Sequence, residues 1–336
     1  MKADSIKSEL ESYASTVNNF ILAFVKGEPK ELYHASSHYI RTGGKRLRPF
    51  MVLKGCEMLG GNAERALPAA AAVELVHNFT LVHDDIMDND EMRHGAATVH
   101  RYYGMPLAIL AGDILFSKAF ELLTFNCRKV GISDKSIIDM VEHLSLACTE
   151  ICEGQAIDVE VASSAKFPSV QHYIDMIGKK TATLFEVSCT LGALSSPNHT
   201  ASDVRNLSSF GRNIGIAFQL VDDLIGIIGD PKLTGKASGN DIREGKKTFP
   251  ILLALKGANK EDAEKIRRVF GTRGKALNQD IQEAVKIISQ IGIEQEVRTE
   301  ARRYLHEALK SIEGYGDSDA RRSLQFSADF VVGRSL

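Results

Sequence analysis

The sequence contains no tryptophan, only eight prolines, and five cysteines among 336 residues. Its longest apolar runs are well short of the about 18 residues that a membrane-spanning helix needs. The first residues show no apolar stretch behind their charges, so we expect no secretory signal. An odd number of cysteines in such a chain argues against structural disulfides. These absences together favour a cytoplasmic protein without a transmembrane segment.

Excess charge of either sign is also missing. The chain has 41 Lys and Arg against 43 Asp and Glu, a formal net charge of −2. A balanced chain is not expected to wrap nucleic acid or to coat an anionic membrane, although local basic patches remain compatible with it. We therefore predict small-molecule partners and no nucleic acid.

Two of the cysteines, Cys148 and Cys152, are four residues apart, so a helix would place both on one face. A metal-binding or redox pair more often has two intervening residues. We therefore interpret both as small buried residues.

The 3.6-residue hydrophobic period recurs in long blocks, whereas strand-like alternation is hard to find. Short polar or Gly/Pro breaks separate the blocks, and no break is long enough for an interdomain linker. Pro68, Pro106 and Pro168 are interpreted as residues of first helical turns, where proline is tolerated. The sequence therefore predicts one all-α domain. The predicted helical blocks are 67–90, 106–127, 136–162, 170–194, 201–228, 249–255, 260–270, 277–291 and 294–312; 320–336 is a further candidate.

A cluster of carboxylates ends the first block. Asp84 and Asp88 are four residues apart and lie on one face of a helix, where like charges destabilise. Asp90 and Glu91 follow them. A hard divalent cation such as Mg²⁺ would relieve this repulsion, because it prefers oxygen ligands and keeps waters and phosphate oxygens. The alternative for this cluster alone is a solvated acidic helix end.

A second carboxylate cluster lies in the block 201–228. Gln219, Asp222, Asp223, Gly226 and Asp230 follow one another at helical steps, and isoleucines flank this stripe. Buried carboxylates are costly without partners, so we predict that this stripe meets cations or a wet cavity. We therefore predict that the two Asp-bearing helices form facing walls of one cavity.

Basic segments complete the pattern. Residues 43–49 read GGKRLRP, Lys179-Lys180-Thr181 begins another helical stretch, and 235–247 is a Gly-rich segment with several cations. A metal ion would bind phosphate oxygens of a diphosphate, and Lys and Arg would neutralise the negative charge that remains. The sequence thus indicates a diphosphate site.

These motifs resemble those of the trans-isoprenyl diphosphate synthases, and most closely the archaeal-type geranylgeranyl diphosphate synthases. The resemblance rests on GGKRLRP at 43–49, DDIMD at 84–88 and GKASGNDIREGKKT at 235–248, in matching order and spacing. It implies a helical bundle of the isoprenoid synthase type, with residues 1–336 as one polyprenyl-synthetase-like catalytic domain. It also implies three Mg²⁺ ions, prenyl diphosphate substrates and a homodimer.

The resemblance assigns roles to individual residues. Lys45, Arg48 and His77 would bind isopentenyl diphosphate, and His94 would do so weakly. Metal ligands would be Asp84, Asp88 and Asp222. The allylic diphosphate would be held by Arg93, Lys180, Gln219, Lys236 and Lys246. Thr181 and Gln219 would also stabilise the developing allylic cation through their oxygen dipoles.

Two positions depart from the family pattern. His94 stands where a second arginine is usual, and an ordinary imidazole is mostly neutral at pH 7, so weaker isopentenyl diphosphate binding is predicted. Gly226 stands where many members have the last Asp of a second DDxxD. Members similar to this chain share that glycine, and we expect activity to survive it.

Product length is predicted from Phe79, five residues before Asp84 and about 7.5 Å along a helix. In the family this position forms the floor of the pocket for the growing tail. The small Thr80 and the absence of an insertion in DDIMD resemble enzymes that make C20 products. The alternatives are an ordinary core phenylalanine, and an enzyme that stops largely at C15.

Three other interpretations fit less well. A terpene cyclase would not need Lys45 and Arg48. A di-iron bundle would use the ExxH motifs at Glu74 and Glu91, but only 17 residues separate them, whereas such motifs come from separate helices. A non-catalytic subunit of the same family would tend to lose its Asp-rich clusters.

Overall fold

The computed structural model describes residues 3–93, 95–229, 239–270 and 276–333. Helices form nearly all of its elements. Within the described residues the strands are β1 (Met92–Arg93) and β2 (Ala96–Ala97), which pair antiparallel. The predicted all-α class is thereby confirmed. Among the helices described, none combines the length and the apolar character needed to cross a membrane.

The contacts divide the chain into two compact units. Unit 1 comprises Met1–Cys148, Leu184–Ser208 and Gly314–Phe326, and unit 2 comprises Thr149–Thr183, Ser209–Glu313 and Ser327–Leu336. Four of the five borders fall within helices, namely α9 (Asp134–Ser163), α11 (Thr183–Ser195), α12 (Ala201–Ile228) and α19 (Asp319–Val332); the fifth, between Glu313 and Gly314, lies outside the helices. A single catalytic domain over 1–336 stays a prediction.

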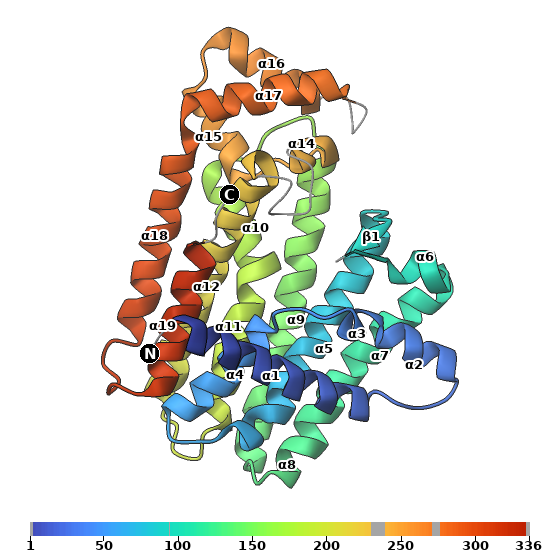
Figure 1. Ribbon diagram of the computed structural model, residues 1–336, viewed down its shortest axis with the longest axis vertical. Coiled ribbons are helices and arrows are strands. Elements are labelled where there is room, and N and C mark those ends of the chain that lie inside the picture. The colour runs from blue at the N-terminus through green and yellow to red at the C-terminus, as the bar shows by residue number, and fades with distance from the viewer. Residues whose placement is uncertain (1–2, 94, 230–238, 271–275, 334–336) are drawn as a thin grey trace. The chain divides into compact units, whose positions relative to one another are not determined.

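Unit 1 is built around α5 (Ala63–Met87), which packs against α4 (Leu47–Met58) and α7 (Met105–Glu121) (Figure 1). The Asn62 side chain caps α5 by accepting the Arg65 N–H at 2.9 Å. A run of small residues, 69–72, is fully buried and allows close helix packing. The other elements of unit 1 are α1 (Ala3–Phe24), α2 (Lys30–Ser36), α3 (His38–Arg41), α6 (Val99–Tyr103), η1 (Leu122–Asn126) and α8 (Cys127–Lys129).

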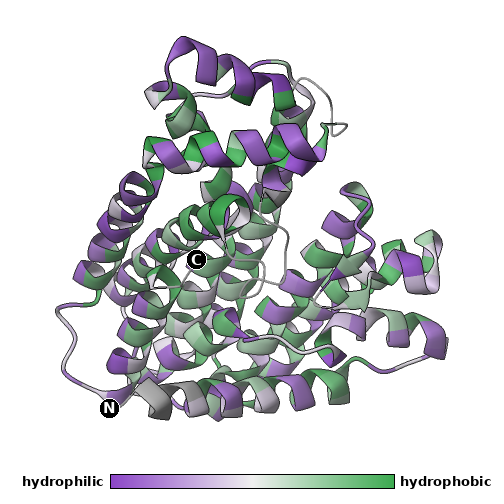
Figure 2. Ribbon diagram, turned by 45° about the horizontal axis from the view of Figure 1, so that its top comes forward, coloured by the Kyte–Doolittle hydropathy of each residue, from purple (hydrophilic) through white to green (hydrophobic). Residues whose placement is uncertain are grey.

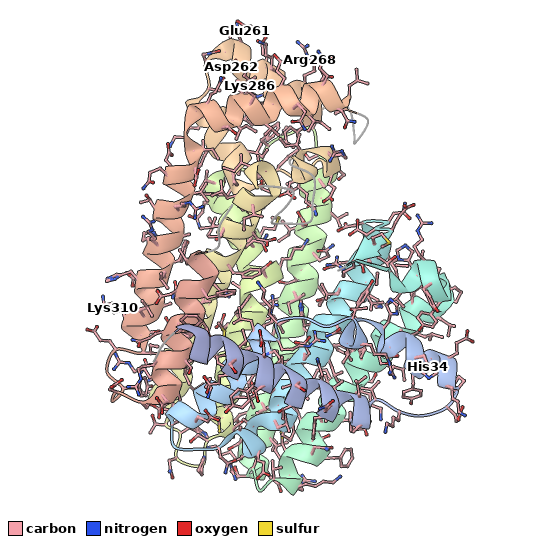
Figure 3. All side chains as sticks on the ribbon, viewed as in Figure 1. His34, Glu261, Asp262, Arg268, Lys286 and Lys310 are labelled. Atoms are coloured by element: carbon pink, nitrogen blue, oxygen red, sulfur yellow. The ribbon has the colours of Figure 1, made fainter. Side chains whose placement is uncertain are left out.

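In unit 2, the apolar helix α15 (Phe249–Gly257) packs against α16 (Lys260–Phe270), α17 (Asn278–Ile291) and α18 (Ile293–Ser311). Hydrophilic residues dominate α16 (Figure 2), and its Glu261, Asp262 and Arg268 project away from the helix (Figure 3). This strongly amphipathic helix buries Ala263, Ile266 and Val269. The remaining elements of this unit are α10 (Val170–Ile177), η2 (Gly178–Ala182) and α14 (Asn240–Glu244).

Several local predictions need correction. Pro68 lies inside α5, and Pro168 precedes the N-cap residue Ser169 of α10, so of these three prolines only Pro106 occupies a first turn. Cys148 is buried but Cys152 is exposed, so they are not both core residues. The block 170–194 is interrupted by the π-helical turn η2. The helices α1, α2 and α4 were not among the predicted blocks.

Candidate active site

The first carboxylate cluster lies at the C-terminal end of α5. Asp84 is half-buried in the last turn, and Asp88 is the exposed C-cap residue whose N–H donates to the Asp84 carbonyl at 2.8 Å. The C-terminus of a helix carries partial negative charge, so carboxylates there are unfavourable unless a cation accompanies them. The position therefore favours a cation site on both sequence and structural grounds.

Asp85, between these residues, has a different environment. It is buried, and its Oδ1 accepts from Arg93 Nε at 2.6 Å and Nη2 at 2.5 Å. Its Oδ2 accepts from the hydroxyl of buried Tyr39. Burial and the hydrogen bond to Asp85 raise the pKa of Tyr39, which keeps the phenol protonated as a donor. Asp85 thus holds Arg93, on strand β1, beside the Asp-rich end of α5.

The predicted isopentenyl diphosphate residues surround the start of α4. Gly43 and Gly44 have positive φ angles of 96° and 150°, and lead into the exposed Lys45. Arg48 Nη1 lies 3.4 Å from His77 Nε2, and its guanidinium carbon lies 4.2 Å from the centroid of the Phe185 ring. The structure therefore brings Arg48 and His77 together, while Lys45 lies on the preceding turn.

Arg46, in the same segment, supports the site through buried contacts that could not be read from the sequence. It is buried in the left-handed conformation at φ 50°, and its Nη1 donates to Glu74 Oε1 at 2.8 Å. Its Nε donates to Asn18 Oδ1 at 2.7 Å and its Nη2 to the Ile40 carbonyl at 3.0 Å. Burial raises the pKa of Glu74, and the charge of Arg46 opposes this effect. Arg46 anchors the turn to α5, and Glu74 is engaged in this ion pair, which further weakens the di-iron interpretation.

Phe79 belongs to an aromatic cluster between α5 and α7. Its ring centroid lies 4.8 Å from that of His83 and 5.3 Å from that of Phe116. Thr80, the next residue, donates from its hydroxyl to the His77 carbonyl at 2.8 Å. Phe79 is half-buried rather than enclosed in the core, and its role as the floor of a substrate pocket stays a prediction.

In unit 2, the turn η2 presents Lys180 and Thr181. Lys180 Nζ lies 2.5 Å from Asp158 Oδ2, and Thr181 donates to Gln219 Oε1 at 2.9 Å. Two glycines permit this turn to pack closely. An added Cβ at Gly154 of α9 would lie 2.3 Å from the backbone nitrogen of Lys180, and one at Gly215 of α12 would lie 2.5 Å from the Ala182 Cα.

The second carboxylate cluster, like the first, contains a half-buried aspartate followed by a buried one. Asp222 is half-buried, whereas Asp223 is buried and accepts from the Tyr173 hydroxyl and from Gln219 Nε2, the latter at 2.8 Å. Burial and the charge of nearby Asp241 raise the pKa of Asp223, and its two donors oppose the rise. The prediction that the whole stripe faces cations or water is therefore wrong for Asp223, which meets protein donors.

Asp241 also accounts for Gly226. A Cβ at Gly226 would lie 2.3 Å from Asp241 Oδ2, so the carboxylate of Asp241 fills the space beside Gly226. The family position that often carries an Asp is thus adjacent to a carboxylate supplied by α14.

The Gly-rich segment contributes two lysines with different surroundings. Lys246 Nζ lies 2.5 Å from Glu244 Oε2. Lys247 is buried, and its Nζ donates to the carbonyls of Val161 and Ser164 at 2.7 and 2.5 Å. The predicted site residues His94 and Lys236, and Asp230 of the predicted stripe, lie outside the described residues.

Among the described residues, no three His, Cys, Asp or Glu side chains form a group that could hold a metal ion by themselves. Asp84 and Asp88 form a set of two carboxylates with oxygen donors only. Such a set suits Mg²⁺, which usually takes one or two carboxylates and completes its shell with water and phosphate oxygens.

A helical fold with two Asp-bearing helices, one that holds Arg93 and one that contacts the Lys180-bearing turn η2, is typical of a trans-prenyltransferase. The family model described as polyprenyl synthetase matches residues 29–288. The chain belongs to this family.

Individual relatives extend over the whole chain. A geranylgeranyl diphosphate synthase from Sulfolobus acidocaldarius is 39% identical over 322 residues, which are 95% of this chain and 96% of the relative. The crystal structure of geranylgeranyl pyrophosphate synthetase from Pyrococcus horikoshii superposes with a TM-score of 0.91 at 37% identity, covering 100% of both chains. A polyprenyl synthase from Caulobacter crescentus, complexed with calcium and isoprenyl diphosphate, has a TM-score of 0.89 at 31% identity and covers 99% of this chain and 98% of its own.

Proposed function

We propose that the protein condenses isopentenyl diphosphate with allylic diphosphates of five, ten and fifteen carbons, and that its main product is geranylgeranyl diphosphate. The observation that carries this proposal is the ion pair of Arg93 with Asp85, which holds a cation beside Asp84 and Asp88. This arrangement matches the needs of a metal-bound diphosphate, and family membership supplies the reaction class.

The allylic diphosphate is held by cations and by metal-binding carboxylates. Asp84, Asp88 and Asp222 would hold Mg²⁺, with three ions in all. These ions, when bound, neutralise the charge that grows on the leaving diphosphate. Arg93, Lys180, Gln219, Lys236 and Lys246 would contact the same diphosphate.

Isopentenyl diphosphate is bound by Lys45, Arg48 and His77, with a weaker contribution from His94. The short separation of Arg48 and His77 supports this set, because both can contact one phosphate group. Arg46 does not contact substrate in this proposal, since its donors already meet Glu74, Asn18 and a backbone carbonyl.

In the reaction, the bond between the allylic carbon and the diphosphate oxygen breaks, and the double bond of isopentenyl diphosphate attacks the resulting cation. Thr181 and Gln219 present oxygen atoms that stabilise this cation. The proton lost afterwards passes to the released diphosphate, so a dedicated general base is not required.

The protein acts as a homodimer in the cytoplasm in this proposal. Several large apolar side chains of unit 1 are exposed in the single chain, and a partner subunit would cover them. They are Met105, Ile109 and Leu110 on α7, Phe125 on η1, and Ile138 and Leu146 on α9.

The proposal is tested by incubating the purified protein with Mg²⁺, labelled isopentenyl diphosphate and one allylic primer at a time. We expect a C20 product from all three primers, and loss of the product with a chelator or in Asp84→Asn. Mainly C15 product would retain the reaction and revise the product length. No condensation with any primer would overturn the proposal in favour of a non-catalytic family subunit.

A further inference from the structure

Each of the two Asp–Asp pairs combines a half-buried carboxylate with a buried one. In unit 1, Asp84 is half-buried while Asp85 is 1% exposed; in unit 2, Asp222 is half-buried while Asp223 is 3% exposed. The first Asp of each pair is the proposed metal ligand. The second therefore has another task.

A buried tyrosine contacts the second Asp in both units. Tyr39, 2% exposed, donates to Asp85 Oδ2, and Tyr173, 3% exposed, donates to Asp223 Oδ2. The two tyrosines come from different helices, α3 and α10, so the shared arrangement is not a local sequence repeat.

The other oxygen of each buried carboxylate holds a side chain that the proposed function places at the substrate. Asp85 Oδ1 accepts from Arg93 at 2.5 and 2.6 Å, and Asp223 Oδ1 accepts from Gln219 Nε2 at 2.8 Å. Because its amide nitrogen is engaged by Asp223, Gln219 directs its oxygen towards Thr181, whose hydroxyl donates to it.

A carboxylate can rotate about its Cβ–Cγ bond, and a hydrogen bond to one oxygen fixes the direction of the other. In a buried site such a bond has little competition from water and gains strength from its neighbours. The tyrosine hydroxyl is thus linked, through one aspartate, to the orientation of Arg93 or Gln219.

We propose that Tyr39 and Tyr173 are positioning residues of the prenyl-transfer reaction, which fix Arg93 and Gln219 by clamping Asp85 and Asp223. This inference rests on the proposed roles of Arg93 and Gln219. It assigns different kinetic consequences to the two clamps, because Arg93 binds the diphosphate whereas Gln219 also stabilises the cation.

The opposing explanation is a purely structural role. The Tyr39 hydroxyl also accepts the Val99 N–H at 3.2 Å, which ties α3 to the segment after the β1–β2 hairpin. A structural role predicts a lower melting temperature without a selective change in one kinetic parameter, so kinetics and thermal unfolding are measured on the same variants.

The test uses Tyr39→Phe and Tyr173→Phe, which remove only the hydroxyl. We expect Tyr39→Phe to raise the KM for the allylic diphosphate about fivefold while the KM for isopentenyl diphosphate changes by less than about twofold. Tyr173→Phe should lower kcat about tenfold and raise the allylic KM up to about fivefold, because Gln219 has both roles, while the KM for isopentenyl diphosphate changes by less than about twofold. Tyr315→Phe is the matched control, because Tyr315 donates to Asp203 at 2.7 Å, and the other hydrogen bonds of the Asp203 side chain within the described residues are to Thr200.

Arg93→Gln and the double variant Tyr39→Phe/Arg93→Gln separate the clamp from the proposed function. If Arg93→Gln leaves the allylic KM unchanged, the role of Arg93 is wrong. If Arg93→Gln raises the allylic KM and Tyr39→Phe does not, the clamp is wrong. The clamp is also wrong if Tyr39→Phe raises the KM for the allylic diphosphate and the KM for isopentenyl diphosphate equally, or if its kinetics match those of Tyr315→Phe. If the Tyr39 hydroxyl acts through Arg93, the double variant should have the same allylic KM as Arg93→Gln alone. Asp85→Asn tests the same link should Tyr39→Phe not fold.

Discussion

Phe79 contacts the rings of His83 and Phe116 and is half-buried, so its removal opens space next to α5 without emptying the core. We expect Phe79→Ala to lengthen the main product beyond C20, because the growing tail gains the volume of the ring. Product length after dephosphorylation measures the effect. Phe125→Ala, at an exposed phenylalanine of η1, is the control and should leave the product at C20. An unchanged product in Phe79→Ala would remove Phe79 as the floor.

His94 is predicted to bind isopentenyl diphosphate weakly because an ordinary imidazole is mostly neutral at pH 7. An arginine would add a permanent charge and a forked donor. We expect His94→Arg to lower the KM for isopentenyl diphosphate by about three- to tenfold, with little change for the allylic substrate. Steady-state kinetics with each substrate varied in turn decide the matter, and an unchanged KM would contradict the assigned role.

Lys246 and Lys247 are adjacent in sequence but have different environments, and substitution should separate their roles. Lys247→Met leaves two carbonyls near the C-terminal end of α9 without their donor, so the free energy of unfolding should fall by about 1–3 kcal/mol. Lys246→Met should change it by less than about 0.5 kcal/mol and raise the allylic KM about tenfold. Denaturant unfolding and kinetics on both variants measure this contrast, and equal losses of stability would show that the two lysines share one role.

At the scale of elements, η2 depends on close backbone approach. Gly154→Ala would force α9 away from the backbone of Lys180, and we expect a loss of about 1–3 kcal/mol in the free energy of unfolding. This loss opposes the gain of about 1 kcal/mol that alanine usually brings to a helix. Because η2 carries Lys180 and Thr181, kcat should fall as well.

Gly316→Ala is the control for that experiment, since nothing lies within 4 Å of the added Cβ. It should leave both the stability and the rate close to those of the unchanged protein. If Gly154→Ala and Gly316→Ala have equal free energies of unfolding and equal kcat values, η2 can pack against α9 without this close backbone approach.

Sequence periodicity predicted some elements well. The blocks 201–228 and 260–270 have the same bounds as α12 and α16, because both show a clear apolar face between polar breaks. The turn η2 escaped prediction because a single wider turn leaves the apolar composition of 170–194 unchanged. The helix α1 was missed although Leu10, Val17 and Ile21 recur at helical steps between polar residues, which is the pattern of a helix with one buried face.

The candidate site was predictable only in part. Asp84, Asp88 and Asp222 follow from motif and spacing, but adjacent aspartates look alike in a sequence. Burial separates Asp85 and Asp223 from them, and the tyrosines that contact these two aspartates lie 46 and 50 residues away in the chain. The burial of Arg46 was not predictable for the same reason, since a run of cationic residues does not indicate which side chain is buried.

For the whole molecule, the exposed apolar side chains of unit 1 lead to a prediction about assembly. Ile109 of α7 is 44% exposed and Leu146 of α9 is 58% exposed, although both are large aliphatic residues. If a second copy covers them, a charge at either position will be buried without a partner and will weaken association. We expect Ile109→Glu and Leu146→Glu to shift the protein from dimer towards monomer at micromolar concentration, as measured by sedimentation velocity. Leu277→Glu, at a 70% exposed leucine of unit 2, should leave the dimer intact, and a monomeric unchanged protein would contradict the homodimer itself.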